Sequence, residues 1–318
     1  MEQDSVIYAA RLKNRKQLYH SSSGGMFTAI SDHFLQRGGA VICSIYCYET
    51  NTMNYALCTS EAQRNAALGS KYIQSNPNDI FKTSIEWLDA NPEKQIVFFG
   101  VGCHAAAYQK YVSLKGYTHR VIVVDIICHG GASPLIWHDY LAHCFSKKKI
   151  NYVTFKDKRC GWLRPTALVL IGKKEIPIPE YIRLFYGGCI LRPCCAKCPY
   201  CKMKRGVDIT IGDFWNIEKT IPDFFDEIGT SVVLLHTIAG KQLFAEISEQ
   251  LDYRMSNEIE CWQPNLSKPT KFSENRDSFW TDYAQRGFRY VYNKYAADNL
   301  WIKAKKMIKG LLSKVFHL

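Results

Sequence analysis

The segment from Leu191 to Trp215 contains four cysteines within eight residues. They are Cys194, Cys195, Cys198 and Cys201. Three of them follow the spacing C-x2-C-x2-C, which lets tight turns direct soft thiolate ligands to one metal centre. Zinc sites and iron–sulfur clusters share this spacing, so it predicts a metal site without choosing the metal. Buried thiols that only pack as small hydrophobes are the alternative, but such a dense run of cysteines beside two prolines argues against it.

Two further cysteines each end an apolar stretch and precede a histidine. GVGCH (100–104) follows the apolar run 95–100, and ICHGG (127–131) ends the run 120–128. Ligands of α/β sheets bind beyond the carboxyl ends of the strands. Either Cys103 or Cys128 could be a nucleophile with its histidine as base. Two such pairs on neighbouring strands fit better as two ligands that join a CxxC pair and complete the four thiolates of a 4Fe–4S cluster.

The remaining cysteines lie in or beside apolar segments, and we interpret them as structural. They are Cys43, Cys47, Cys58, Cys144, Cys160, Cys189 and Cys261.

Two loops have the composition of an anion site. SSGG (22–25) precedes an amphipathic helix, so serine hydroxyls, backbone amides and the helix N-terminus would face a bound anion together. In GSKYIQS (69–75), Lys71 could neutralise a phosphate and Tyr72 could stack on a ring. Each loop also has an ordinary interpretation as a turn.

The elements that must position these residues alternate between strand and helix over the first 150 residues. Strands are expected at 6–12, 40–49, 53–59, 95–100 and 120–128, with helices between them and one that begins at Ser133 and Pro134. Further strands follow at 151–157, 166–172, 208–215 and 230–237, and the chain is largely helical from Ser273. This pattern predicts an α/β fold with a mixed sheet flanked by helices, a Cys-rich segment and a helical C-terminus. We expect a flavin-binding region over 1–150, a Cys-rich sheet region over 151–270 and a helical extension over 271–318.

Composition narrows the class of protein. The 318 residues include 13 cysteines, without an N-terminal signal peptide or an apolar run of about 18 residues. These features predict a protein of the reducing cytoplasm, in which clustered cysteines serve metal or redox chemistry. The net charge of +12 has no nucleic-acid motif beside it and fits an anionic cofactor or partner. Five lysines and an apolar face in residues 301–318 predict a basic amphipathic helix, which would contact a membrane surface, a partner or its own domain.

Seven of these motifs occur in an order that resembles the beta subunits of coenzyme F-420 hydrogenases and dehydrogenases. They are SSGGMFTA, GSKYIQS, GVGCH, DIICHG, FKDKRCGW, LRPCCAKC and DITIGDFW, and they cover roughly residues 20–250. 7-Hydroxymethyl chlorophyll a reductase is similar too. The resemblance implies an iron–sulfur flavoprotein that binds FAD and a 4Fe–4S cluster. Such proteins pass electrons between a one-electron carrier, such as a ferredoxin, and a two-electron acceptor, such as a deazaflavin.

The resemblance also implies roles for individual residues. Ser22, Ser23, Gly24 and Gly25 would hold the flavin phosphates, with Gly69, Ser70, Lys71 and Tyr72 beside them. Cys103, Cys128, Cys195 and Cys198 would be the cluster ligands, with Cys201 and Cys194 as alternates. No catalytic residue is assigned. The chain starts downstream of the ferredoxin-like segment of many relatives, so we expect a separate protein to supply electrons.

Two interpretations stay open at this point. The polar residues Asp213, Lys156, Asp157, Lys158 and Arg159 are candidates for flavin or substrate contacts, although such residues at strand ends are often only solvated. The alternative to the redox function is a structural zinc site of Cys194, Cys195, Cys198 and Cys201 in a binding or transferase protein.

Overall fold

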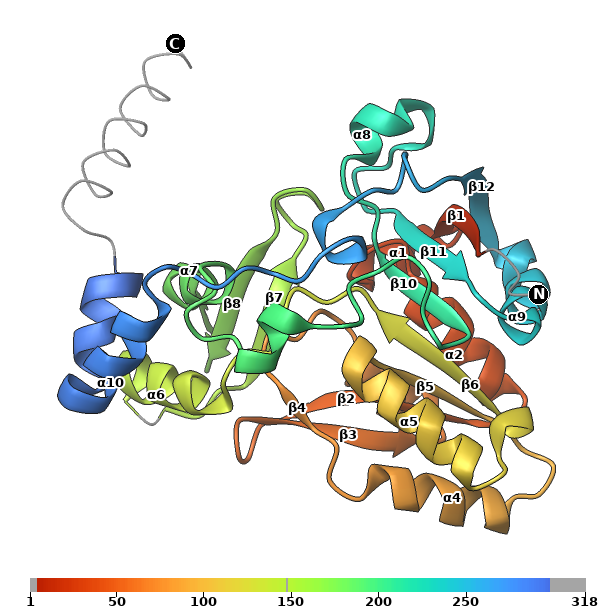
Figure 1. Cartoon of the computed structure of the whole chain (residues 1–318), viewed down its shortest axis with the longest axis horizontal. Helices are drawn as coiled ribbons and strands as arrows, with labels where there is room; N and C mark the ends of the chain where they lie inside the picture. The colour runs from red at the N-terminus through yellow and green to blue at the C-terminus, as the bar shows by residue number, and fades with distance from the viewer. Residues whose placement is uncertain (1–4, 147, 298–318) are drawn as a thin grey trace.

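The fold mixes strands and helices as the sequence predicts (Figure 1). The computed structural model describes residues 5–146 and 148–297. The strands are β1 (Val6–Leu12), β2 (Ala40–Cys47), β3 (Thr52–Cys58), β4 (Ser75–Asn76), β5 (Ile96–Val101), β6 (Val121–Ile126), β7 (Tyr152–Asp157), β8 (Thr166–Ile171), β9 (Lys174–Pro177), β10 (Ile209–Asp213), β11 (Ser231–Leu235) and β12 (Leu251–Ser256). The helices are α1 (Arg15–His20), α2 (Met26–Gln36), α3 (Glu61–Asn65), α4 (Ile80–Ala90), α5 (Gly102–Leu114), α6 (Pro134–Phe145), α7 (Pro179–Tyr186), α8 (Ile217–Thr220), α9 (Ile238–Ile247) and α10 (Arg276–Val291).

The main sheet has nine strands in the order β12-β1-β11-β10-β6-β5-β2-β3-β4. Strand β6 lies within the expected strand 120–128, and it pairs in parallel with both β5 and β10. Antiparallel pairs join β2 to β3 and β1 to both β11 and β12. The sheet is therefore mixed, and it draws strands from both sides of residue 150.

Helices cover both faces of this sheet (Figure 1). Val97 and Phe99 of β5 pack in one apolar cluster with α2 and α9, whereas Ile96 and Phe98 pack in another with α4 and α5. Successive side chains of a strand point to opposite faces, so a strand covered on both faces must be apolar at every position. The uninterrupted apolar sequence of β5 is thus explained.

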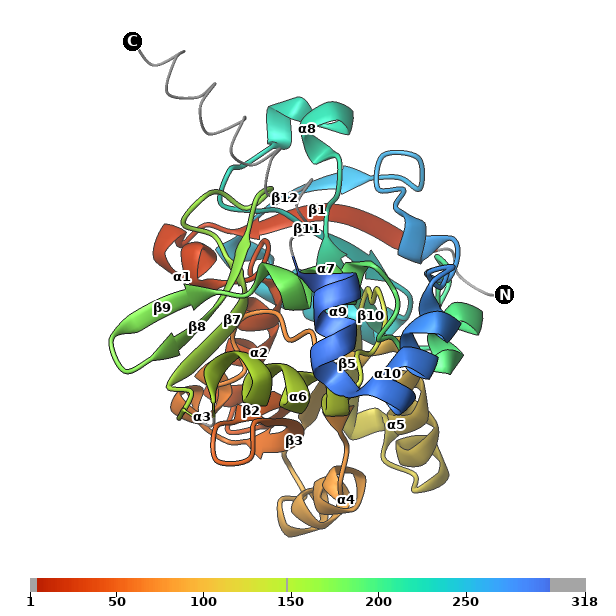
Figure 2. The same ribbon diagram turned by 90° about the vertical axis from the view of Figure 1, so that its left-hand side faces the viewer.

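A second, three-stranded sheet in the order β7-β8-β9 lies beside the first with α6, α7 and α10 (Figure 2). Its core is aromatic, with Trp137, Tyr140, Tyr181 and Phe279 fully buried. Helix α10 continues into a π-helical turn at Tyr292–Ala296. The basic tail predicted over 301–318 lies outside the described residues, and the boundaries near 150 and 270 stay a prediction.

Five elements were not predicted from the sequence, namely α1, α8, β4, β9 and β12, and each lacks a clear periodic pattern. Helix α1 has only six residues and depends on Asn14, whose side chain accepts hydrogen bonds from the backbone N–H groups of Lys16 and Gln17. Strand β9 is short and largely exposed, and β12 buries little besides Leu251. Within residues 5–146 and 148–297, no helix is long and apolar enough to cross a membrane.

Gly24 brings the loop before α2 against the sheet. A Cβ atom at this position would lie 2.2 Å from the carbonyl oxygen of Ala10 and 2.5 Å from the backbone nitrogen of Ser231. The Gly24 N–H also donates to the Ser231 hydroxyl at 2.9 Å. Only glycine, which has no Cβ, lets this loop approach the backbones of β1 and β11 so closely.

We expect Gly24→Ala to lower the free energy of unfolding by about 3 kcal/mol, because the added methyl group meets backbone atoms that cannot move independently. Gly206→Ala is the matched control, since a Cβ there meets nothing within 4 Å. Urea denaturation of both variants measures the difference. Equal stabilities would contradict this account of Gly24.

Candidate functional site

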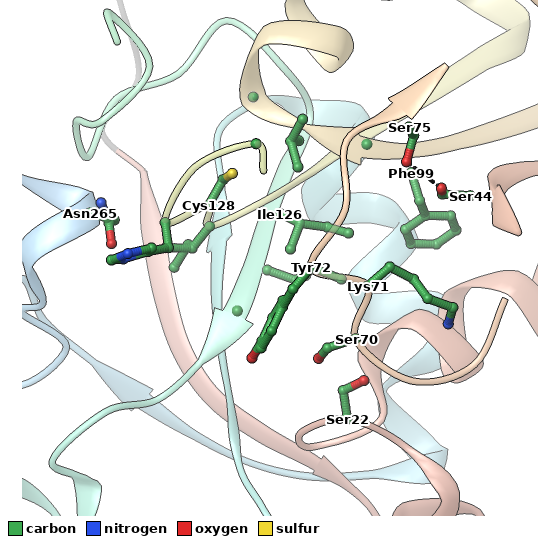
Figure 3. A pocket seen from close by; sticks show the side chains of 18 of the residues that line it. Ser22, Ser44, Ser70, Lys71, Tyr72, Ser75, Phe99, Ile126, Cys128 and Asn265 are labelled. Atoms are coloured by element: carbon green, nitrogen blue, oxygen red, sulfur yellow. Dashed lines mark hydrogen bonds between the residues drawn. The ribbon is translucent and has the colours of Figure 1, made fainter. Parts of the chain in front are cut away.

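A cavity of about 410 Å³ lies at the carboxyl ends of β5 and β6 (Figure 3). Its wall combines the loop before α2, residues 67–75, the start of α5, the segment after β6, the end of α7 and the Cys-rich segment. The volume is within the range of about 300–1000 Å³ that is common for ligand and cofactor sites. Both predicted anion loops and both Cys–His pairs therefore border one space.

The loop before α2 contributes most of its predicted residues to this cavity. Ser22, Ser23 and Gly25 line it, whereas Gly24 does not. The Ser23 hydroxyl donates to the carbonyl oxygen of Thr230 at 2.9 Å, so its side chain is held by the sheet. Gly25 adopts a left-handed backbone conformation at the N-terminus of α2, with φ of 84°. Ser22 has the side chain best placed to meet a ligand, and it projects into the cavity in Figure 3.

All four predicted residues of the second loop line the cavity, but two of them are already engaged. The Lys71 ammonium donates to the carbonyl oxygens of Ala67, Leu68 and Gly69 at 2.6–3.2 Å. Burial lowers the pKa of Lys71 to about 8. The Lys71 ammonium therefore binds the backbone of its own loop with all three N–H donors. Its positive charge still lies beside the cavity.

Tyr72, which was expected to stack on the ring of a ligand, stacks on a phenylalanine of the protein instead. Tyr72 stacks on Phe185 at 4.6 Å between ring centroids, and its hydroxyl accepts a hydrogen bond from Tyr186 at 3.2 Å. Phe185 and Tyr186 end α7, and both line the cavity. Sequence reasoning missed these two residues, because their segment gives only a helical pattern and carries no motif.

The cysteines expected as ligands converge on one end of the cavity. Cys103, Cys128, Cys195 and Cys198 line it, as do the alternates Cys194 and Cys201. Burial, then the neighbouring thiols Cys103 and Cys195, raise the pKa of Cys128 to about 12. Burial also raises the pKa of Cys103, with Cys198 and Cys195 adding to it. Negative charges on these sulfurs thus interact, and only a bound cation would make several thiolates stable together.

The spacing of these thiols differs from that of a single-ion site. In the described part of the chain, no group of three or more Cys, His, Asp or Glu side chains is arranged to hold one metal ion. A zinc ion takes four ligands itself, whereas each iron of a 4Fe–4S cluster takes one thiolate, so cluster ligands surround a larger volume. Six thiols line this part of the cavity, and thiolates are the ligands that such a cluster takes.

Backbone contacts fix the Cys-rich segment, which has only the short 3-10 helix Pro193–Lys197 as regular structure. The Gly131 N–H donates to the Cys195 sulfur at 3.3 Å, and Leu191 forms an isolated bridge with Ala132. The segment after β6 and the Cys-rich segment therefore run side by side, which brings Cys128 towards the CxxC pair.

A buried ion pair secures the other end of the Cys-rich segment. The Arg205 guanidinium lies 2.7 Å from the Asp125 carboxylate, with side chains 3% and 1% exposed. Arg205 also donates to the carbonyl oxygens of Lys202 and Asn265. Sequence reasoning missed this pair, although an aspartate within the apolar run 120–128 was a signal that a buried partner must exist.

The five polar residues proposed as contacts divide sharply. Asp213 lines the cavity, and the other four do not. Lys156 lies 2.5 Å from the Asp213 carboxylate, and the Trp162 indole N–H donates to it at 3.2 Å. Lys158 donates to two backbone carbonyls, and Arg159 pairs with Asp157 and Glu175 outside the cavity. Only Asp213 is placed to meet a ligand.

The two histidines of the Cys–His pairs also border the cavity. His104 Nδ1 lies 3.1 Å from the Tyr55 hydroxyl, and burial lowers the pKa of His104. His129 Nδ1 faces the Thr270 hydroxyl at 3.4 Å, and its buried Nε2 has no hydrogen-bond partner among the described residues. Both rings are therefore favoured in the neutral form, since burial penalises the charged imidazolium.

The fold and the site together define a mixed α/β protein with a cavity at the carboxyl edge of its sheet, bordered by a cluster of thiols. Residues 93–260 match the family described as the C terminus of the coenzyme F420 hydrogenase/dehydrogenase beta subunit, and the chain belongs to this family. The resemblance carried by the seven motifs is thereby confirmed, and the family supports an oxidoreductase.

The fold has a solved counterpart. The chain is similar to a chain from a structure of the xenon-derivatised F420-reducing [NiFe] hydrogenase complex of Methanosarcina barkeri. The two share 14% identity at a TM-score of 0.56, over 80% of this chain and 83% of that one, which shows a shared fold. No curated protein matches the chain.

The buried ion pair gives a prediction for Arg205→Met. Loss of the guanidinium leaves Asp125 as an unpaired buried acid, which should cost about 3–5 kcal/mol of unfolding free energy at pH 7. Burial already raises the pKa of Asp125, and the charge of Arg205 opposes that rise. The pKa of Asp125 should therefore rise further in the variant.

The sign of the pH dependence follows. The pKa of an aspartate in the unfolded protein is about 3.9, and the pKa of Asp125 in the folded protein is higher. Such a group stabilises the folded protein fully at pH values below its unfolded-state pKa. This stabilisation is lost as the pH rises through the folded-state pKa. The deficit of Arg205→Met should thus be largest at neutral pH and shrink towards pH ~4. Denaturation at both pH values measures it, and the double variant Arg205→Met/Asp125→Leu should recover most of the loss. An equal deficit at both pH values would contradict the role of Asp125.

Proposed function

We propose that this protein is an oxidoreductase that uses FAD and one 4Fe–4S cluster to pass electrons between a one-electron carrier protein and a two-electron acceptor. The acceptor would be a deazaflavin such as coenzyme F-420 or another small molecule. The observation that carries the proposal is one shared cavity, which has the two loops predicted to bind an anion in one part of its wall and six thiols in another. The two cofactors would then lie close enough for direct electron transfer.

The flavin part of the proposal depends on the loops before α2 and before β4. Ser22 and Ser70 line the cavity and project towards it in Figure 3, so their hydroxyls would face a bound ligand. The N-terminus of α2 adds partial positive charge to this region. Phosphate groups would contact Ser22, Ser23 and Gly25, and the ring system would extend towards Tyr72 and Phe99.

The cluster part depends on the donor set. Cys103, Cys128, Cys195 and Cys198 are the proposed ligands, because their charges interact with one another across the cavity. Cys194 and Cys201 stay alternates, since they neighbour Cys195 and Cys198 respectively. When bound, a flavin exchanges one or two electrons and a cluster exchanges one, which is the chemistry that links the two kinds of partner.

The protein's own residues would bind and shield this chemistry. Buried Phe99 and half-buried Tyr72 keep water from the inner wall, and the charge of Lys71 favours an anionic, reduced site. Exposed Trp215 and Tyr186 border the same cavity and would contact an incoming planar substrate. The related hydrogenase chain belongs to a complex, so a separate electron-carrier protein is the expected partner.

A zinc-stabilised protein without redox activity is the second candidate function. It is favoured by one observation, the pairwise contact of Cys194 with Cys195 and of Cys198 with Cys201. This candidate predicts a colourless protein, and it places Cys103 and Cys128 outside the metal site.

Metal and flavin analysis after anaerobic purification separates the two candidates. We expect a brown protein with about four irons and one FAD per chain. Cys128→Ser and Cys195→Ser should each lose most of the iron, because either change removes a thiolate. Cys261→Ser should keep it, because this buried cysteine does not line the cavity. One zinc, no flavin and full metal retention in Cys128→Ser would refute the redox function.

Ser22→Glu tests the phosphate loop. A carboxylate at this position would repel the diphosphate of FAD, and we expect the dissociation constant to rise at least tenfold, equivalent to about 1.4 kcal/mol. Ser22→Gln is the matched control, because it has the same volume without the charge. Fluorescence titration of flavin-depleted protein with FAD gives both constants. Equal weakening by Glu and Gln would show that volume rather than phosphate charge matters there.

A further inference from the structure

Cys43 and Cys58 form a second thiol pair that the proposed cluster does not use. Cys43 lies within β2 and Cys58 ends β3, and their sulfur atoms are 3.9 Å apart. Both side chains are buried, and Cys43 also lines the cavity. The two cysteines are 15 positions apart in the chain, so their spacing alone did not suggest a pair.

The strand register explains how the two sulfurs meet. Cys43 is paired with Ala56, and Cys58 with Val41, so the two cysteines are diagonal neighbours on one face of the hairpin. Diagonal Cα atoms are commonly about 7–8 Å apart, just beyond the separation of about 4.4–6.8 Å that a disulfide usually spans. Closing the bond therefore requires the two strands to approach slightly. A disulfide formed in this way is more easily reduced than one that merely staples a fold.

Two largely buried cations lie on the same side of the sheet as this pair. The Arg64 guanidinium is held 2.5 Å from the Asp32 carboxylate, and Lys71 is held by three backbone carbonyls. The charges of both cations favour a thiolate at Cys43, and that of Arg64 favours one at Cys58. Thiolates are the reactive form of cysteine in disulfide chemistry.

The two thiols differ in their access to the cavity. Cys43 lines it, whereas Cys58 does not. Their sulfur atoms are within hydrogen-bonding distance of each other, and either can be the donor. Cys43 is therefore the sulfur that would meet a flavin in the cavity, and Cys58 is its partner in disulfide exchange.

We propose that Cys43 and Cys58 are a redox-active dithiol that closes to a disulfide in the wall of the cavity. Two S–H bonds break and one S–S bond forms. The two electrons and two protons pass to an oxidised flavin in the cavity, which becomes the reduced flavin, and the reverse step restores both thiols. The flavin coupling rests on the proposed function, whereas the disulfide itself does not. The pair would store two electrons beside the flavin.

Thiol trapping in the wild-type protein tests the disulfide without any variant. Samples equilibrated anaerobically in dithiothreitol buffers of increasing oxidising strength are quenched in acid, unfolded, alkylated and digested. We expect Cys43 and Cys58 to lose alkylation together, in one two-electron transition, and a cross-linked peptide to appear. Cys58→Ser should leave Cys43 alkylated under every condition, and Cys261→Ser should leave the transition unchanged. Independent alkylation of both thiols in every buffer would overturn the proposal.

A reductive titration of the same preparation tests the coupling to flavin. After oxidation, wild-type protein that contains FAD should take up two electrons per chain more than Cys58→Ser before reduction is complete. Equal electron uptake in the two proteins would overturn the coupling. Because the trapping experiment is read on peptides, a preparation that lacks flavin but still forms the disulfide would refute the proposed function and the coupling, and would support the dithiol alone.

Discussion

The buried ion pair between Arg205 and Asp125 is the constraint on which the site depends. The Cys-rich segment has little regular structure, so neither a helix nor a sheet ladder can hold its cysteines in place. Asp125 belongs to the central strand β6, and its carboxylate meets the guanidinium that follows the last cysteine of the segment at 2.7 Å. Two charges removed from water are tolerated only while they remain paired, and the pair therefore has one low-energy arrangement. This ion pair therefore holds the Cys-rich segment at the carboxyl end of β6.

A second set of contacts turns this anchored segment into one wall of a cavity. The Gly131 N–H meets the Cys195 sulfur, and the Ala132–Leu191 bridge aligns the segment with the chain that leaves β6. Helix α7 packs on the smaller sheet and ends at the cavity. There Phe185 stacks on Tyr72, and the two rings form part of the cavity wall. A redox site benefits from such enclosure, because burial and fixed charges tune the potential of whatever is bound. The same burial raises the pKa of the thiols, so their charged forms depend on a cationic group among them.

Positive charge around the cavity follows a consistent pattern. Lys71, Arg64 and Arg205 are all buried or nearly so, and each is held by backbone carbonyls or an aspartate rather than by solvent. Fixed cations in a region of low dielectric favour anions and thiolates far more than surface lysines do. Arg64 and Arg205 are each paired with an aspartate, so Lys71 is the one of these three cations that adds net positive charge to the cavity. The proposed cluster ligands and Cys43 line the same cavity as Lys71.

Local sequence determined most strands and most helices, because β5 and β6 are largely apolar and Ser60 and the glycines before α2 mark helix starts. Motif order determined the family, and the spacing of Cys195 and Cys198 predicted a soft metal centre. The apolar runs before Cys103 and Cys128 already indicated that both cysteines lie at the ends of neighbouring strands. Only the tertiary structure removed Lys156 and Arg159 from the cavity and showed that Lys71 and Tyr72 are engaged by the protein itself. Ion pairs and stacking between residues such as Arg205 and Asp125 depend on distances across the fold. Sequence spacing carries no information about those distances, whereas periodicity and turn chemistry are local and can be read directly.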